Sequence, residues 1–234
     1  MIKILLFGND AHKLKNKALK AGLEVVEEKS TPVRRDKPDV VVSFGGDGTF
    51  LMAEAVFPYI PKIILKNSRI CKLCVKTTPE KAFIALKNKK YKIEKLPKIE
   101  VIYGKEKLVA VNDIVVHNKD PRHGMRYKVW IDGEQVNTEI IGDGVVVATP
   151  LGSSGYYRSI TDSIFETGIG LAFNNSTEQS DHMVLKKERI IELEITRGPA
   201  YAFADNQTKH LVIEEGERVK IKIHKISTEI IKVI

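Results

Sequence analysis

Short apolar runs alternate with longer stretches rich in lysine, leucine and alanine through the first part of the chain. The runs predicted as strands are residues 2–7, 23–27, 39–44 and 61–65. The stretches predicted as helices are residues 11–20, 50–55 and 78–86, the last opening on Thr78-Pro79-Glu80. Because strand and helix alternate, we expect an α/β domain over residues 1–96 with a parallel sheet wrapped by helices.

After Pro97 the pattern changes to strand signals separated by turns such as Gly104-Lys105 and Asp132-Gly133. The predicted strands are residues 99–103, 108–116, 126–131, 145–148, 189–196, 200–204, 210–213 and 218–225. Residues 97–225 are therefore predicted to form a second, β-rich domain. Periodicity leaves open whether the last segment, residues 226–234, closes this domain or returns to the first.

A glycine-rich loop, Gly45-Gly46-Asp47-Gly48-Thr49, joins a predicted strand to a predicted helix. Glycines let the backbone turn tightly and approach a ligand, and the first N–H groups of a helix are available to an anion. The loop is therefore a candidate phosphate site. The alternative is a simple strand-to-helix turn in which Asp47 or Thr49 caps the helix.

A second polar stretch runs from Gly142 to Tyr156, where a Pro-Leu-Gly-Ser turn follows a strand ending at Ala148. Such a turn places hydroxyls, backbone amides and one aromatic ring at a cleft, although a serine-rich hairpin loop is the alternative. Upstream, Asn112-Asp113 interrupts an apolar run, and a bulge or a strand-end turn also explains these two residues.

The chain carries a formal net charge of +8 and has a pI near 9.3, with a lysine cluster between Lys87 and Lys98. The cluster contains Lys87, Lys89, Lys90, Lys92, Lys95 and Lys98. We interpret it as a solvated surface and expect no nucleic-acid partner, because no stacking platform or zinc-finger pattern accompanies the lysines. A basic field also suits polyanionic nucleotides.

Residues 1–234 contain no apolar run near the roughly 20 residues of a membrane span, so we expect no membrane partner and a cytoplasmic location. Cys71 and Cys74 form a single Cys-x-x-Cys pair. Without a second pair it lacks the ligands of a structural zinc site, and we interpret it as two packed or incidental thiols.

Taken together, four segments resemble the NAD kinase family. The segments are Gly45–Thr49, Asn112-Asp113, Gly142–Tyr156 and Asp205-Asn206-Gln207. Their order and spacing match the family over roughly residues 39–225. The resemblance implies a phosphofructokinase-like (Rossmann-like) α/β domain, a β-rich NAD-binding domain, and an active site between them.

The resemblance also implies a role for individual residues. Asp47 resembles the catalytic carboxylate near the adenosine ribose 2′-OH of NAD. The residues that would receive the donor phosphates are Gly45, Gly46, Gly48 and Thr49. The residues that would hold NAD are Asn112, Asp113, Asp143, Ser154, Gly155, Tyr156, Ser159, Asp205 and Asn206.

The chain departs from the family pattern in several places. Asp113 stands where the family has Glu, Leu151 where it has Thr, and Asn206 where it has Gly. Residues 65–74 lack two glycines of the family and carry cations instead. These departures bear on phosphate contacts and donor preference more than on the reaction.

The implied reaction transfers the γ-phosphoryl group of ATP, or of another donor, to NAD and produces NADP. Mg²⁺ or another divalent cation would arrive with the donor, and we expect no all-protein metal site. The resemblance further suggests a dimer or tetramer. The alternatives are a lipid kinase of the diacylglycerol or sphingoid type, which shares the glycine loop, and a non-catalytic nucleotide-binding module.

Overall fold

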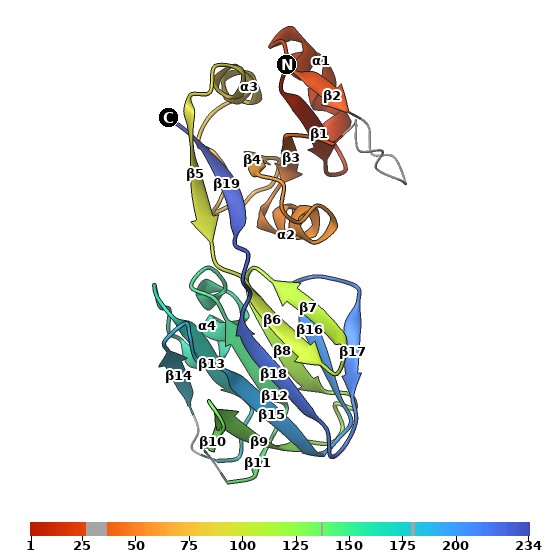
Figure 1. Cartoon of the computed structure of the whole chain (residues 1–234), viewed down its shortest axis with the longest axis vertical. Coiled ribbons are helices and arrows are strands. Elements are labelled where there is room, and N and C mark those ends of the chain that lie inside the picture. Colours follow the sequence, from red (N-terminus) through yellow and green to blue (C-terminus); the bar gives the residue numbers. More distant parts are fainter. Residues whose placement is uncertain (27–36, 137, 179–180) are drawn as a thin grey trace. The chain divides into compact units, whose positions relative to one another are not determined.

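The computed structural model describes residues 1–26, 37–136, 138–178 and 181–234. They form two compact units, Met1–Leu96 with Ser227–Ile234, and Pro97–Ile226 (Figure 1). Each unit has its own hydrophobic core. The predicted order, an α/β region followed by a β-rich region, is confirmed.

The first unit is built on a six-stranded sheet in the order β2-β1-β3-β4-β19-β5. Its strands are β1 (Lys3–Phe7), β2 (Glu24–Val26), β3 (Val40–Gly45), β4 (Lys62–Lys66), β5 (Tyr91–Leu96) and β19 (Thr228–Val233). Its helices are a 3₁₀ helix (Ala11–Leu14), α1 (Lys15–Lys20), α2 (Asp47–Val56) and α3 (Pro79–Lys87). All neighbouring strands are parallel except β19 and β5, which are antiparallel.

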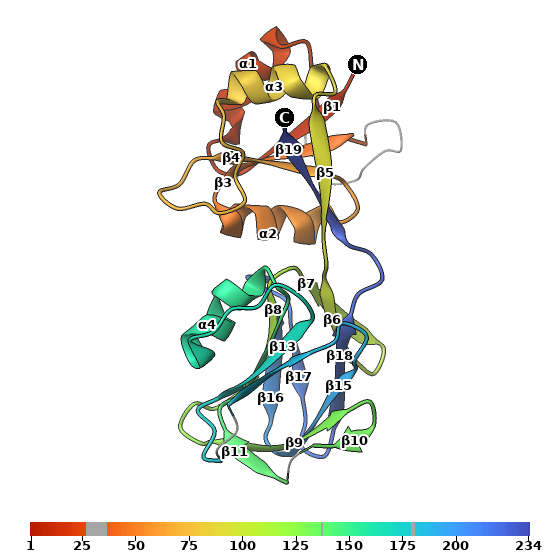
Figure 2. The same ribbon diagram turned by 90° about the vertical axis from the view of Figure 1, so that its left-hand side faces the viewer.

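Helices cover both faces of this sheet (Figure 2). On one face, Ala18 of α1 and Phe83 of α3 pack in a core with Ile4 of β1. On the other face, Ala53 of α2 packs with Leu5 of β1. Successive residues of a strand point to opposite faces, so the continuous apolar runs of β1 and β3 are what a sheet buried on both sides requires.

The C-terminal segment, whose place the periodicity left open, returns to the first unit as β19 between β4 and β5. A buried polar cluster holds it there. Thr228 Oγ1 donates to Glu54 at 2.6 Å, and the same carboxylate pairs with the ammonium group of Lys62. Lys62 also donates to the Phe57 carbonyl at 2.7 Å, so the buried charges are paired and hydrogen-bonded as burial demands.

The lysine cluster is only partly the solvated surface that the sequence predicted. Its members up to Lys95 are exposed, and β5 runs through them although no strand was predicted there. Lys98 is 2% exposed, so its assignment to the solvated surface was wrong. The reason is that Lys98 directly precedes β6 (Ile99–Tyr103), and its carbonyl accepts a backbone hydrogen bond from His224.

The second unit contains two sheets packed face to face around one apolar core. The first sheet, in the order β10-β9-β15-β18-β6-β7 with β11 beside β9, contains β6, β7 (Glu106–Ala110), β9 (Met125–Ile131), β10 (Glu134–Gln135), β11 (Ile140–Gly142), β15 (Ile191–Arg197) and β18 (Arg218–Ile223). The second, in the order β14-β13-β12-β8-β16-β17, contains β8 (Asp113–Asn118), β12 (Gly144–Ala148), β13 (Ile169–Asn174), β14 (His182–Leu185), β16 (Ala200–Ala204) and β17 (His210–Ile213).

The strand predicted over residues 108–116 is two strands in different sheets. Strand β7 ends at Ala110 in the first sheet, and β8 begins at Asp113 in the second. Asn112 therefore lies at a corner where the chain passes from one sheet to the other. Of the two alternatives, a bulge or a strand-end turn, the structure shows the turn. The serine-rich stretch is not a hairpin loop. It forms a 3₁₀ helix, Gly152–Ser154, followed by helix α4 (Tyr156–Thr161), and α4 packs Tyr157 against β12 and β13.

Candidate active site

The glycine loop joins the carboxyl end of β3 to the first residue of α2. Gly46 precedes the helix, and no side chain caps it, so the simple capping role for Asp47 or Thr49 is not observed. The glycines are needed for local packing, because a Cβ at Gly45 would collide with the Thr49 side chain and one at Gly46 would lie 2.8 Å from Ser68 Oγ. The two glycines therefore allow the loop to turn tightly into the start of α2.

A cavity of about 520 Å³ lies beside this loop in the first unit. It is lined by Leu6, Phe7, Gly8, Asn9, Asp10, Phe44, Gly45, Thr49, Met52 and Asn67. Most of these residues lie at or just after the carboxyl ends of β1, β3 and β4, the edge at which open α/β sheets bind ligands, and Thr49 and Met52 belong to α2. Of the predicted donor-site residues, the structure places Gly45 and Thr49 at this cavity.

Sequence reasoning missed Gly8, Asp10 and Asn67 at the same cavity. Gly8 has a φ of +121°, and a Cβ there would collide with the Phe44 carbonyl, so this position requires glycine. Asn67 Nδ2 donates to Asp10 at 3.1 Å. Hydrogen bonds from Lys13 and Asn67 lower the pKa of Asp10, which is therefore ionised at neutral pH. The sequence signal that could have identified these residues is their position just after the strands β1 and β4.

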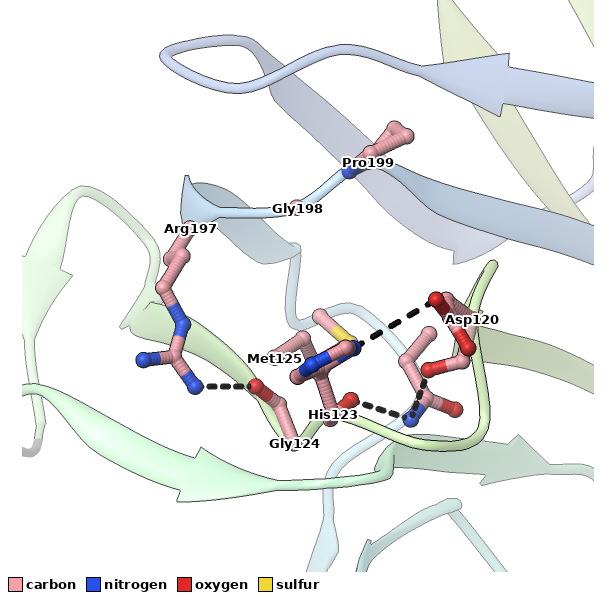
Figure 3. Close-up of a pocket in the computed structure, with 8 residues that line it drawn as sticks. Asp120, His123, Gly124, Met125, Arg197, Gly198 and Pro199 are labelled. Atoms are coloured by element: carbon pink, nitrogen blue, oxygen red, sulfur yellow. Dashed lines mark hydrogen bonds and ion pairs between the residues drawn. The ribbon is translucent and has the colours of Figure 1, made fainter.

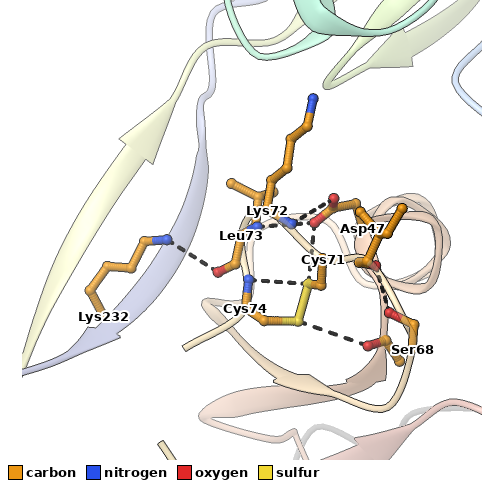
Figure 4. The surroundings of a disulfide bond; sticks show 9 residues. Asp47, Ser68, Cys71, Lys72, Leu73, Cys74 and Lys232 are labelled. Atoms are coloured by element: carbon orange, nitrogen blue, oxygen red, sulfur yellow. Dashed lines mark hydrogen bonds between the residues drawn. A yellow bond between two sulfur atoms is a disulfide. The ribbon is translucent and has the colours of Figure 1, made fainter. Parts of the chain in front are cut away.

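The Asp47 carboxylate receives two backbone hydrogen bonds from a neighbouring loop (Figure 4). The amide of Lys72 donates to Oδ2 at 2.9 Å, and the amide of Leu73 donates to Oδ1 at 3.1 Å. Cys71 Sγ lies 3.4 Å from Oδ1. As the first residue of α2, Asp47 also lies at the positive end of the helix dipole.

Cys71 and Cys74 form a disulfide, so the prediction of two thiols was wrong. The two Cα atoms are 5.6 Å apart because the chain folds back after β4, with the amide of Cys74 donating to Cys71 Sγ at 3.2 Å. The lack of a second cysteine pair argued against a zinc site, but the closure of a short loop is a property of backbone shape that the spacing does not show. Since Cys71 is oxidised, its contact with Asp47 involves no shared proton.

In the second unit, Asp205 gathers the backbone at the corner between the sheets. Its carboxylate accepts hydrogen bonds from the amides of Val111 and Asn112, both at 2.8 Å, and from that of Asp113 at 3.2 Å. The amide of Asp205 in turn donates to the Asp113 carbonyl at 3.0 Å. Asp205 has a φ of +49°, a left-handed conformation that Asp tolerates. Asn112, Asp113 and Asp205 are therefore brought together as one group.

Asp113 has an unusual protonation equilibrium. Burial, and then the nearby charge of Asp205, raise the pKa of Asp113 to about 7. A carboxyl with such a raised pKa is partly protonated at neutral pH, and a protonated carboxyl can donate as well as accept a hydrogen bond.

Thr149 ties the second predicted segment to the same corner. Its hydroxyl donates to the Val111 carbonyl at 2.6 Å and accepts from the amide of Gly152 at 3.2 Å, while its own amide donates to the Asn112 carbonyl at 2.8 Å. A Cβ at Gly152 would collide with the Asn112 carbonyl. Thr149 and Gly152 belong to the stretch that the sequence indicated but had no individual role there, and they position the backbone around Asn112.

The remaining predicted residues of this segment surround the start of α4. Ser154 is half-buried and Gly155 is exposed, with the ideal Cβ position of Gly155 3.9 Å from Asp113 Oδ2. Tyr156 is 39% exposed, and its hydroxyl accepts a hydrogen bond from Asn174 Nδ2 at 3.1 Å. Ser159 donates to the Tyr156 carbonyl at 2.7 Å. The exposed ring of Tyr156 offers a flat surface to a base, and its hydroxyl reaches Asn174, which pairs with Gly144 in the β12–β13 register.

Asp143 lies apart from Asn112, Asp113 and Asp205, although its amide donates at 2.9 Å to the carbonyl of Asn174, the residue that also bonds Tyr156. In the β8–β12 register Asp113 pairs with Ala148, whereas His117 pairs with Gly144, so Asp143 is at the opposite end of both strands. The separation is about 17 Å at about 3.4 Å per residue. Asp143 accepts hydrogen bonds from Asn118 at 3.3 Å and from Asn175 at 2.7 Å.

A second cavity, of about 350 Å³, lies at that end of the second unit (Figure 3). It is lined by Asn118, Asp120, His123, Gly124, Met125, Arg197, Gly198 and Pro199. None of the predicted site residues lines it, although Asn118 connects it to Asp143.

Within the described ranges, no cluster of three or more His, Cys, Asp or Glu side chains is arranged to hold a metal ion. No helix of the described residues is long and apolar enough to cross a membrane.

Comparison with known proteins settles the family. Residues 111–233, more than half of the chain, match the family described as the ATP-NAD kinase C-terminal domain. The chain belongs to the NAD kinase family. The matched residues include Asn112, Asp113, Asp143 and Asp205, whereas the glycine loop lies outside the match.

Relatives and solved structures of this family support the assignment. An NAD kinase of Saccharolobus islandicus is 34% identical over 158 residues, which is 67% of this chain and 58% of the relative. An NAD kinase of Thermomicrobium roseum is 25% identical over 85% of the chain and 72% of the relative. The chain thus spans 58% of the length of the first of these NAD kinases.

The fold is shared with NAD kinase family structures. An NAD kinase from Archaeoglobus fulgidus, solved in complex with ATP, superposes with a TM-score of 0.79 at 22% identity, covering 99% of this chain and 93% of the other. A yeast NADH kinase complexed with NADH superposes with a TM-score of 0.86 at 18% identity, covering 100% and 84%. The two-part fold is therefore that of NAD kinases.

Proposed function

We propose that the protein is an NAD kinase, which transfers the γ-phosphoryl group of ATP to the adenosine ribose 2′-OH of NAD and forms NADP. The observation that carries this proposal is the family match over residues 111–233, because it contains the corner at which Asn112, Asp113 and Asp205 meet. The Archaeoglobus enzyme was solved with ATP and the yeast enzyme with NADH, which are the two classes of ligand that the reaction needs.

The donor is proposed to bind at the glycine loop. Gly45 and Thr49 line the cavity at the carboxyl edge of the parallel sheet, and Gly46 and Gly48 flank the first residue of α2. A helix start of this kind favours phosphate through its N–H groups and its dipole. Gly8 and the Asp10–Asn67 pair border the same space.

NAD is proposed to bind at the corner of the second unit. Asn112 and Asp113 supply polar groups to the adenosine, Asp205 holds their backbone, and Tyr156 offers its ring. Ser154, Gly155, Ser159 and Asn206 belong to the same proposed site. Asp143 lies at the far end of β12 from Asn112. It would therefore contact a part of the dinucleotide remote from Asn112, or have a purely structural role. Separate substitution of Asp143 and Asn112 distinguishes these possibilities.

Mg²⁺ is proposed to accompany the donor. Such ions usually keep several waters and bind through one or two carboxylates together with substrate phosphates. Among the described residues that line the cavity, the carboxylate is Asp10, which now pairs with Lys13 at 2.6 Å. When bound, Mg²⁺ would neutralise phosphate charge. The cytoplasmic location and the homo-oligomer expected from the sequence stay predictions.

Asp47 is proposed as the general base. The 2′-hydroxyl oxygen attacks the γ-phosphorus, the bond from phosphorus to the bridging oxygen of ADP breaks, and Asp47 accepts the hydroxyl proton. Two backbone amides hold its carboxylate, which has roughly four acceptor positions and therefore retains room for the substrate hydroxyl.

The experiment is an assay of purified protein with ATP, Mg²⁺ and NAD, scored for NADP, with diacylglycerol and a sphingoid base as competing acceptors. We expect NADP and no phosphorylated lipid. A lipid product without NADP would favour the lipid kinase alternative, and binding of NAD or ATP without any product would favour the non-catalytic module.

A further inference from the structure

The loop from Cys71 to Cys74 contacts the proposed catalytic carboxylate directly. The amides of Lys72 and Leu73 donate to its two oxygens, and Cys71 Sγ lies 3.4 Å from Oδ1. Figure 4 shows these three groups directed at Asp47 from the same short segment. The orientation of the carboxylate is therefore determined by the shape of this loop.

The shape of the loop depends on a few attachments. The disulfide closes it, Lys232 Nζ donates to the Leu73 carbonyl at 3.2 Å, and the amide of the buried Val75 donates to the Ile64 carbonyl at 2.9 Å. Residues 66–70 before it are exposed. An exposed segment with little apolar packing opens easily when a covalent closure is removed.

We propose that the Cys71–Cys74 pair is a positioning element for Asp47, so that turnover depends on the oxidation state of the pair. The inference rests on the proposed function, in which Asp47 accepts the proton of the 2′-hydroxyl. In the oxidised protein, the closed loop holds both amides against the carboxylate. In the reduced protein, the loop is released, the two hydrogen bonds become intermittent, and a Cys71 thiol competes as a donor to Oδ1.

The redox step requires a dithiol reductant. A thiolate of the reductant attacks one sulfur of the pair, the Cys71–Cys74 bond breaks, and a mixed disulfide forms. The second thiol of the reductant then displaces it, so that two electrons pass to the pair, each cysteine ends as a thiol and the reductant ends as a disulfide. Both cysteines are only half-buried, and the exposed cations Arg69 and Lys72 adjoin them, a setting in which such exchange occurs readily.

The first test compares oxidised protein with protein reduced by dithiothreitol, with the thiols counted in each sample. We expect reduction to lower kcat about tenfold, equivalent to about 1.4 kcal/mol, with the KM for NAD within about twofold. Reoxidation should restore kcat. Because reduction is reversible in the wild-type chain, this test does not depend on a variant that folds. An unchanged or higher kcat after complete reduction would overturn the proposal.

Two variants sharpen the comparison. Cys71→Ser combined with Cys74→Ser should match the reduced wild type and ignore the reductant. Ser68→Ala is the matched control, since Ser68 donates to the Ile70 carbonyl at 2.6 Å within the same exposed loop. It should keep the tenfold response to dithiothreitol, and loss of that response would contradict a specific role for the disulfide.

A readout independent of activity separates this inference from the proposed function. In the oxidised protein the Lys72 and Leu73 amide hydrogens should exchange slowly with solvent, and either reduction or Asp47→Ala should accelerate both. If no NADP forms in any state, the proposed function fails. If the exchange of both amides is the same before and after reduction, the positioning role fails.

Discussion

Each unit holds an aspartate whose carboxylate accepts hydrogen bonds from two or more backbone amides, and the two sites differ in which part of the fold supplies those amides. Asp205 binds the amides of Val111, Asn112 and Asp113, which lie at the junction of strands β7 and β8 in two sheets of a common core. Asp47 binds the amides of Lys72 and Leu73, which lie on a loop beside exposed residues.

The same chemistry therefore serves two purposes. Three amides at the corner between β7 and β8 leave Asp205 little freedom, so we expect it to act mainly by stabilising the corner around Asn112. Two amides on a peripheral loop hold Asp47 but leave it some freedom, which would suit the proposed role of accepting a proton during turnover. The same conservative substitution at both positions should separate the two roles.

Asp47→Asn should produce the largest effect. We expect kcat to fall at least about 100-fold, because the amide has the shape of the carboxylate but cannot accept the proton. The free energy of unfolding should change by less than about 1 kcal/mol, since the exposed loop can shift away from the new amide group. Steady-state kinetics and urea unfolding measure both. Turnover close to that of the wild type would remove Asp47 as the base.

Asp205→Asn should show the opposite pattern. Its Nδ2 group would face amide donors that the sheet holds in place, so we expect the free energy of unfolding to fall by about 1–3 kcal/mol. Urea unfolding monitored by circular dichroism measures this loss. The KM for NAD should rise more than kcat falls. A loss of kcat as large as that of Asp47→Asn, without loss of stability, would make the two aspartates equivalent.

The sequence predicted more of the first region than of the second. The strand–glycine–helix order predicted the first unit and its loop, because apolar periodicity and glycine are local signals. The corner at Asn112 was visible only as an interruption of an apolar run. That Asp205, over 90 residues away, holds its backbone depends on strand pairing, which one sequence does not display.

The disulfide and the position of Lys98 were missed for the same reason. The closure of Cys71 on Cys74 depends on the path of the chain after β4, and the burial of Lys98 depends on the pairing of β6 with β18. Strand β5 was missed because its exposed, charged residues resemble a solvated surface. Gly8 and Asp10 were missed because they reach the glycine loop only through the pairing of β1 with β3, which the sequence does not display.

Asp113 gives a smaller, pH-dependent effect confined to the second unit. Its pKa is raised to about 7 from an ordinary value of 3.8. The stabilisation of the folded state by the protonated form is therefore complete below about pH 4 and is lost as the pH rises to about 7. Relative to Asp113→Asn, the wild type should lose stability across this interval and not above it.

Carbon-13 NMR titration of the Asp113 carboxyl provides the direct check, with an expected midpoint near pH 7. A midpoint near pH 4 would show that the corner is more open to water than the structure indicates. Asp47→Asn is the matched control, and it should leave the Asp113 titration unchanged.

Neutralising the exposed lysines should have the smallest effect. In the variant with Lys87, Lys89 and Lys90 all changed to Gln, we expect a KM for NAD within about twofold of the wild type, because solvent and salt screen exposed charges beyond about 10 Å. Binding to nucleic acid should be weak and fall steeply with salt. A sequence-specific complex that persists at about 200 mM salt and is lost in the variant would contradict an enzyme-only function.

The central claim is that the donor binds at the glycine loop and NAD binds at the Asn112 corner. Amide hydrogen exchange of the whole chain, measured with NAD alone and with a non-hydrolysable ATP analogue and Mg²⁺ alone, tests it most directly. We predict that NAD slows exchange at residues 111–113, 152–156 and 205–206, and that the analogue slows it at residues 8–10, 45–49 and 67. Protection of the glycine loop by NAD, with the Asn112 corner unaffected, would contradict the account.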